Sequence, residues 1–97
     1  MDTYIILRRN GWRTPEDLKE AAERSSVTGE DMADQVRWIR SYALAEEAGD
    51  VGTVCVYQAV SPEAIRTHAE RADLPADEII RVADTVIVRE DPVPAAS

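Results

Sequence analysis

The stretch Thr53-Val-Cys-Val-Tyr-Gln-Ala-Val-Ser-Pro-Glu-Ala-Ile-Arg-Thr-His-Ala-Glu-Arg-Ala-Asp-Leu-Pro-Ala-Asp-Glu-Ile-Ile80 decides the fold. Its first seven residues, Thr53–Ala59, are rich in β-branched side chains and predict a strand. Ser61-Pro62-Glu63 then predicts a helix start, because serine caps a helix and proline fits its first turn. Asp73-Leu74-Pro75 ends that helix, since proline cannot continue it. A last strand is expected over Ile79–Val88, bent at Ala83-Asp84.

The preceding half of the chain shows the same order of signals, a strand followed by a capped helix and a second strand. A short branched run predicts a strand over Thr3–Arg9, and Asn10-Gly11 breaks it. Thr14 caps a second helix, expected over Pro15–Asp34 with an interruption near Gly29. Val36–Ala45 alternates and carries aromatic residues, which favours a strand. The acidic, glycine-bearing run that follows it predicts a hairpin to Thr53–Ala59, and a short connection forces that pair to be antiparallel.

The order strand, helix, strand, strand, helix, strand is that of the ferredoxin-like βαββαβ arrangement, an α+β fold. It predicts a four-stranded antiparallel sheet with two helices on one face. We expect one domain over residues 1–90 and a flexible tail over residues 91–97. The other face of such a sheet stays open. An open apolar face in a small domain is commonly buried against a second copy, so we expect a homodimer with the two sheets facing each other.

Composition excludes several classes of partner. The 97 residues carry a formal charge of −8, which argues against nucleic acid or an anionic membrane surface as a partner. The single cysteine cannot form an internal disulfide, which fits a reducing cytoplasm. The sequence has no apolar run long enough for a membrane span, and its N-terminus enters a strand-like run rather than a signal peptide. We therefore expect a cytoplasmic protein.

Strand alternation separates the side chains into an apolar set and a mixed set. We expect the apolar set beneath the helices: Ile5, Leu7, Ile39, Ala43, Val54, Val56, Ile80 and Val82. The mixed set then lies on the open face and, with His68 of the second helix, gives the candidate ligand-binding residues: Tyr4, Arg8, Trp38, Arg40, Tyr42, Cys55, Tyr57 and His68. Arginines beside polar aromatics suit a small anionic or aromatic ligand. The same residue types are enriched in protein interfaces, so these side chains could instead hold a dimer together.

Four segments of the chain resemble a bacterial family of unknown function that is often labelled nickel-binding protein: Val36–Tyr42, Cys55–Ala59, Ser61–Arg66 and Leu74–Ile79. The resemblance extends over about Thr3 to Val88. It implies a ferredoxin-like dimer and leaves the activity unsettled. The nickel-binding members carry histidines near the end of the first strand, where this chain has Arg8-Arg9-Asn10, which would repel a cation. We therefore expect the metal site of the family to be lost, with no metal and no cofactor bound.

The sequence is compatible with three functions. The first is a non-catalytic module that binds a small molecule on the open face. The second is a cofactor-independent enzyme of the dimeric α+β barrel type, such as a cyclase, isomerase or oxygenase, in which Cys55 with His68, or His68 alone, could act on a metabolite. An enzyme should show a closed cavity with Arg8, Arg40, His68 or a tyrosine aimed into it. The third is a protein that binds Ni²⁺ or another transition metal.

Overall fold

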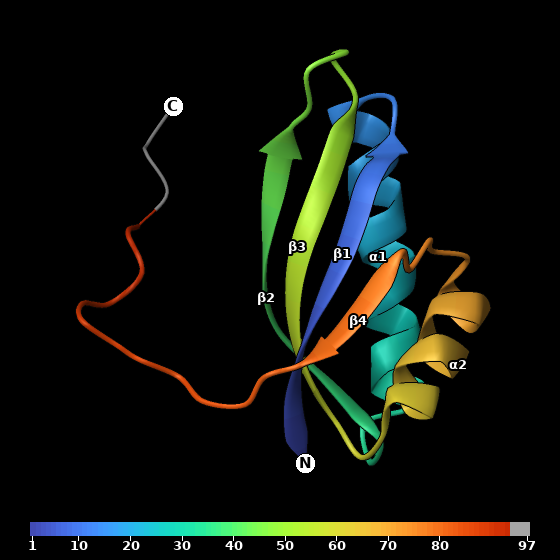
Figure 1. The fold of residues 1–97 in the computed structure, drawn as a ribbon. Helices are drawn as coiled ribbons and strands as arrows, with labels where there is room; N and C mark the ends of the chain where they lie inside the picture. Colours follow the sequence, from blue (N-terminus) through green and yellow to red (C-terminus); the bar gives the residue numbers. More distant parts are fainter. Residues whose placement is uncertain (94–97) are drawn as a thin grey trace.

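The computed structural model describes residues 1–93 (Figure 1). Its elements, in chain order, are β1 (Asp2–Trp12), α1 (Pro15–Asp31), β2 (Val36–Ala45), β3 (Val51–Ala59), α2 (Pro62–Ala72) and β4 (Glu78–Arg81). The strands form one antiparallel sheet in the order β2-β3-β1-β4, and both helices lie on the same face of it. The α+β ferredoxin-like prediction is confirmed. Neither helix combines the length and apolar character needed to cross a bilayer.

The two helix starts have the predicted chemistry. The Thr14 hydroxyl accepts a hydrogen bond from the Asp17 amide, and the Ser61 hydroxyl accepts one from the Ala64 amide. α2 ends at Asp73, which adopts a left-handed conformation with φ of 56°. The expected interruption near Gly29 is wrong, because α1 runs unbroken to Asp31.

β1 is longer than predicted. It passes through Asn10 and Gly11, with an irregular register after Arg8 and a left-handed Asn10 at φ of 50°. The carboxylate of Glu46 supports this bend, because it accepts hydrogen bonds from the Arg9 guanidinium and from the Asn10 backbone amide at 2.8 Å. The side chain of Glu46 is only 4% exposed. The hairpin before β3 therefore holds the end of β1 by a charged contact.

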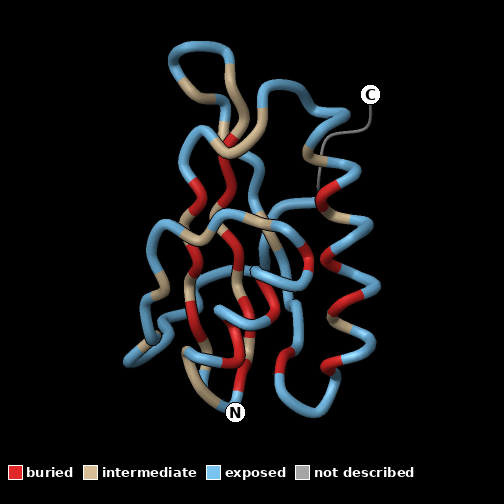
Figure 2. Tube along the Cα trace, turned by 90° about the vertical axis from the view of Figure 1, so that its right-hand side faces the viewer, coloured by how far each residue is buried: buried red, intermediate tan, exposed pale blue. Residues whose placement is uncertain are grey.

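The face assigned to the helices in the sequence prediction is wrong. Tyr4, Ile6 and Arg8 of β1 are buried, as are Cys55 and Tyr57 of β3, so the mixed sets of these two strands lie beneath the helices. Figure 2 shows buried positions alternating with less buried ones along the strands. Alternation separates two faces but does not say which one a helix covers. The helices bring small and polar residues such as Ser25, which give the tyrosine hydroxyl a partner.

β2 also departs from the prediction, because a bulge lies between Trp38 and Arg40. A bulge adds one residue and moves the following side chains to the opposite face. Trp38 therefore pairs with Tyr57 on the helix-covered face, whereas Arg40 and Tyr42 pair with Val56 and Val54 on the open face. The predicted grouping of Trp38 with Arg40 and Tyr42 is wrong for this reason.

β4 has four residues, so the prediction of a strand continuing to Val88 is also wrong. The chain beyond it leaves the sheet after the Val82 amide donates to the Thr3 carbonyl at 2.8 Å. It then runs past β2 at the other edge of the sheet (Figure 1). Part of the predicted tail, residues 94–97, lies outside the described residues.

Candidate functional site

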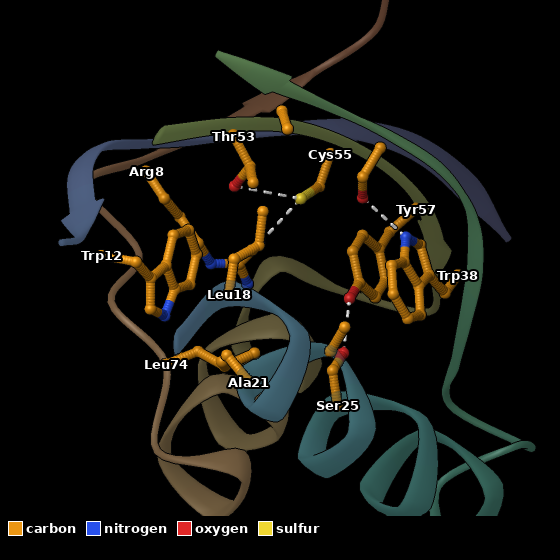
Figure 3. Close-up of a pocket in the computed structure, with 13 residues that line it drawn as sticks. Arg8, Trp12, Leu18, Ala21, Ser25, Trp38, Thr53, Cys55, Tyr57 and Leu74 are labelled. Atoms are coloured by element: carbon orange, nitrogen blue, oxygen red, sulfur yellow. Dashed lines mark hydrogen bonds between the residues drawn. The ribbon is translucent and has the colours of Figure 1, made fainter. Parts of the chain in front are cut away.

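A cavity of about 180 Å³ lies between α1 and the sheet (Figure 3). For comparison, an apolar protein cavity of about 150 Å³ accommodates benzene. Side chains from α1, from β1, β2 and β3, and from the loop after α2 line it: Arg8, Trp12, Leu18, Ala21, Ala22, Ser25, Trp38, Ser41, Ala43, Thr53, Cys55, Tyr57 and Leu74. Most of this wall is apolar, so its few polar groups decide what it can bind.

Arg8 is the one cationic residue of the cavity lining, and it is 2% exposed. Its Nε donates to the carbonyl of Pro75 at 2.5 Å, and its Nη1 donates to the Cys55 sulfur at 3.0 Å. Its Nη2 is buried and has no hydrogen-bond partner among the described residues. Neither of its two acceptors is a carboxylate, so the positive charge of the guanidinium has no anionic partner in its hydrogen bonds.

Cys55 is held between Arg8 and Thr53. Its sulfur accepts from the Arg8 guanidinium and lies 3.4 Å from Thr53 Oγ1, to which it donates. His68 is buried on α2 and does not line the cavity. In the described part of the chain no hydrogen bond joins Cys55 to His68, so the structure does not build the predicted thiol–imidazole pair.

Tyr57 is the centre of a packed aromatic group. Its ring stacks on that of Trp38, with ring centroids 6.1 Å apart and an angle of 4° between the planes. The imidazole of His68 packs against it edge-on, with ring centroids 5.5 Å apart. Its hydroxyl lies 2.9 Å from the Ser25 hydroxyl. Burial raises the pKa of Tyr57, so its phenol stays neutral and acts only as a hydrogen-bonding group at neutral pH.

His68 is fixed behind this group. Its Nε2 lies 3.1 Å from the Ser25 backbone carbonyl, an arrangement in which the imidazole donates. Burial, the largest cause, lowers the pKa of His68. The imidazole is therefore neutral at pH 7 and joins α2 to α1 as a structural contact.

Residues 4–82 match the family model described as nickel responsive protein SCO4226-like. The chain belongs to this family. A solved structure from the same group, that of SCO4226 from Streptomyces coelicolor A3(2), superposes with a TM-score of 0.67 at 25% sequence identity. The alignment covers 87% of this chain and 99% of that one. No curated protein matches the chain. The resemblance to a nickel-binding-like family is confirmed.

In this member of the SCO4226-like family the predicted site residues divide into three groups. Arg8, Trp38, Cys55 and Tyr57 meet around the cavity, although on the covered face. Tyr4 belongs to the hydrophobic core and His68 packs behind the cavity wall. Arg40 and Tyr42 lie on the open face, where both contact Asp91.

Sequence reasoning missed Trp12, Thr53 and Ser25 as parts of the site. The spacing of Leu18 and Ser25 does place both on one face of α1, and this signal was available. Trp12 had no such signal, because its position depends on β1 continuing through Asn10.

Proposed function

We propose that this protein binds a small organic monoanion in the cavity beneath α1, with the carboxylate on Arg8 and an apolar body against the aromatic wall. The observation that carries the proposal is the buried Nη2 of Arg8 without a partner. A buried cation that lacks an anion costs free energy, and a carboxylate that accepts from Nη2 offsets this cost. Among the described residues, the open face around Arg40 and Tyr42 offers no comparable buried donor.

The dimensions and lining of the cavity support a narrow ligand class. A space of about 180 Å³ suits a body the size of one aromatic ring or a short branched chain. Trp12, Leu18 and Trp38 give apolar contacts to such a body, and Arg8 gives one positive charge. We therefore assign a compact monocarboxylate of about the size of benzoate. The site lies within one chain, so binding does not require a second copy.

The polar side chains that line the cavity support ligand binding better than they support catalysis. Arg8 and Tyr57 line a cavity, as an enzyme of the dimeric α+β barrel type would require, but His68 and Arg40 do not. The neutral Tyr57 phenol is engaged by Ser25 and is not a base at neutral pH. These groups orient a ligand without a proton acceptor aimed at it.

Nickel does not fit the donors of a single chain. Residues 1–93 contain no group of three or more His, Cys, Asp or Glu side chains placed to share an ion. Cys55, the one thiol, already contacts the Arg8 guanidinium, which repels a cation. His68 Nε2 is occupied by the Ser25 carbonyl. We propose that the family's nickel response, if this chain shares it, does not run through these side chains.

The test is a titration of the ¹⁵N-labelled protein with sodium benzoate, followed in amide NMR spectra. We expect shifts centred on Arg8, Ser25 and Tyr57, weaker shifts with the neutral benzyl alcohol, and none with NiCl₂. Arg8→Met should abolish the benzoate shifts while its own spectrum reports that it is folded, and Arg8→Lys should retain part of them. Arg66→Met is the matched control, because it removes an equal charge from the exposed side of α2.

Two results would overturn the proposal. Benzoate shifts of equal size in wild type and Arg8→Met would show that the guanidinium is not the anchor. Cavity amides that do not respond to benzoate, isobutyrate or pivalate in the wild type would remove the monocarboxylate class.

A further inference from the structure

Cys55 lies in the cavity wall, where two polar neighbours hold its sulfur (Figure 3). Its thiol donates to Thr53 Oγ1 at 3.4 Å, and its sulfur accepts a hydrogen bond from Arg8 Nη1 at 3.0 Å. The thiol proton is therefore directed to the hydroxyl, and an electron pair of the sulfur faces the cation. A buried cysteine with a purely structural role packs as a small apolar group and needs no such contacts.

A second, independent feature lies beside this sulfur. Arg8 Nη2 belongs to the same planar guanidinium as Nη1, is buried, and has no hydrogen-bond partner among the described residues. Arg8 is 2% exposed and also lines the cavity. Because the N–H groups of a guanidinium form a fixed fork, a molecule in contact with the Cys55 sulfur can accept a hydrogen bond from Nη2 at the same time.

The cavity restricts which molecules can reach the sulfur. Cys55 is 4% exposed, so a reagent meets it within a space of about 180 Å³. Most of the wall is apolar, and Arg8 is its one charged residue in the described part of the chain. A small hydroperoxide fits these conditions, because it is neutral and its oxygens accept hydrogen bonds. The sequence has no second cysteine, so an oxidised Cys55 cannot form a disulfide within the chain and remains a sulfenic acid.

We propose that Cys55 is a site of oxidation by a small hydroperoxide, which Arg8 positions. The sulfur attacks one peroxide oxygen, an S–O bond forms as the O–O bond breaks, and the electron pair passes to the departing oxygen. That oxygen takes up the thiol proton and leaves as water or an alcohol. The sulfur loses two electrons and becomes a sulfenic acid, while the peroxide is reduced. Arg8 Nη2 donates to the departing oxygen, on which negative charge develops. This inference does not rest on carboxylate binding, although both use Arg8.

The test compares the oxidation rate of Cys55 in the folded protein with its rate in the same chain unfolded in guanidinium chloride. Hydrogen peroxide is added to each sample, the sulfenic acid is trapped with dimedone, and intact-mass spectrometry measures the labelled fraction; the single cysteine makes the assignment unambiguous. A cysteine that is merely buried reacts more slowly in the folded protein. The positioned sulfur should react at least about 10-fold faster in the folded protein. A folded rate no greater than the unfolded rate would overturn the proposal.

Substitution of Arg8 tests the donor. Arg8→Lys keeps the charge but lacks the fork, and it should slow the oxidation of folded protein by about 10-fold or more, as should Arg8→Met. Arg66→Met is the matched control, because it removes a cation from the exposed side of α2 and should leave the rate unchanged. Oxidation of a folded Arg8→Met variant at the wild-type rate would refute the role of the guanidinium. The folded and unfolded rates need only the wild type, so they decide the proposal even if an Arg8 variant does not fold.

Discussion

The hydrogen bond between Tyr57 and Ser25 gives the sharpest test of how the covered face is stabilised. Both residues are buried, at 2% and 4% exposure, and their hydroxyl oxygens lie 2.9 Å apart. Tyr57→Phe removes one partner and leaves the Ser25 hydroxyl without it. The lost bond costs about 1 kcal/mol and the orphaned hydroxyl about 1–3 kcal/mol. A domain of this size loses about 4–8 °C in Tm per kcal/mol, so we expect a fall of about 8 °C or more.

Urea unfolding followed by tryptophan fluorescence measures this cost, with all variants at one protein concentration because pairing of chains would shift the apparent stability. Ser25→Ala breaks the same bond, but alanine has a helix propensity about 0.5 kcal/mol more favourable than that of serine. This variant should therefore lose less stability than Tyr57→Phe. The double variant should cost less than the sum of the two by about 0.5–3 kcal/mol. Tyr42→Phe, the same change at a ring 46% exposed, should stay within about 0.5 kcal/mol of wild type. A coupling near zero would refute the assignment of this bond.

Two further predictions concern stability. Because the pKa of His68 is lowered in the folded protein, its contribution to stability should be fully present above the unfolded histidine pKa of about 6.5 and should be lost as the pH falls through that value. Unfolding free energies measured from pH 5 to 8 should show this slope, and His68→Leu should lose it. An unchanged slope in His68→Leu would contradict the buried neutral imidazole. Gly52→Ala should destabilise by about 1–3 kcal/mol, since its Cβ would lie 2.8 Å from the Arg8 carbonyl oxygen. Gly29→Ala on α1 should instead stabilise by up to about 1 kcal/mol, because its nearest neighbour is at 3.8 Å; thermal unfolding of the pair checks the contrast.

The sequence predicted those parts of the fold that depend on local chemistry. Thr14 and Ser61 cap their helices as expected, and Asp73 ends α2, because each of these signals acts within one turn of chain. The order of elements then left one common topology, and the structure has it. The extent of β1 and of β4 was not predictable in the same way, because strand length is set by partners elsewhere in the sheet.

The choice of face needed information that alternation does not contain. Hydrophobicity alone placed Ile5 and Leu7 inside, yet the buried residues of β1 are Tyr4, Ile6 and Arg8. A buried tyrosine or arginine is tolerated where other elements supply its hydrogen-bond partners. Those partners come from distant parts of the chain, as the Pro75 carbonyl does for Arg8.

The bulge in β2 determines which of its side chains lie in the cavity wall and which lie on the open face. Because one extra residue follows Trp38, this strand sends Trp38 to the cavity wall and Arg40 to the opposite face. A regular strand would have placed both side chains on one face, as the sequence suggested. The bulge therefore lets a single edge strand carry an aromatic wall of the cavity and a cationic contact for Asp91.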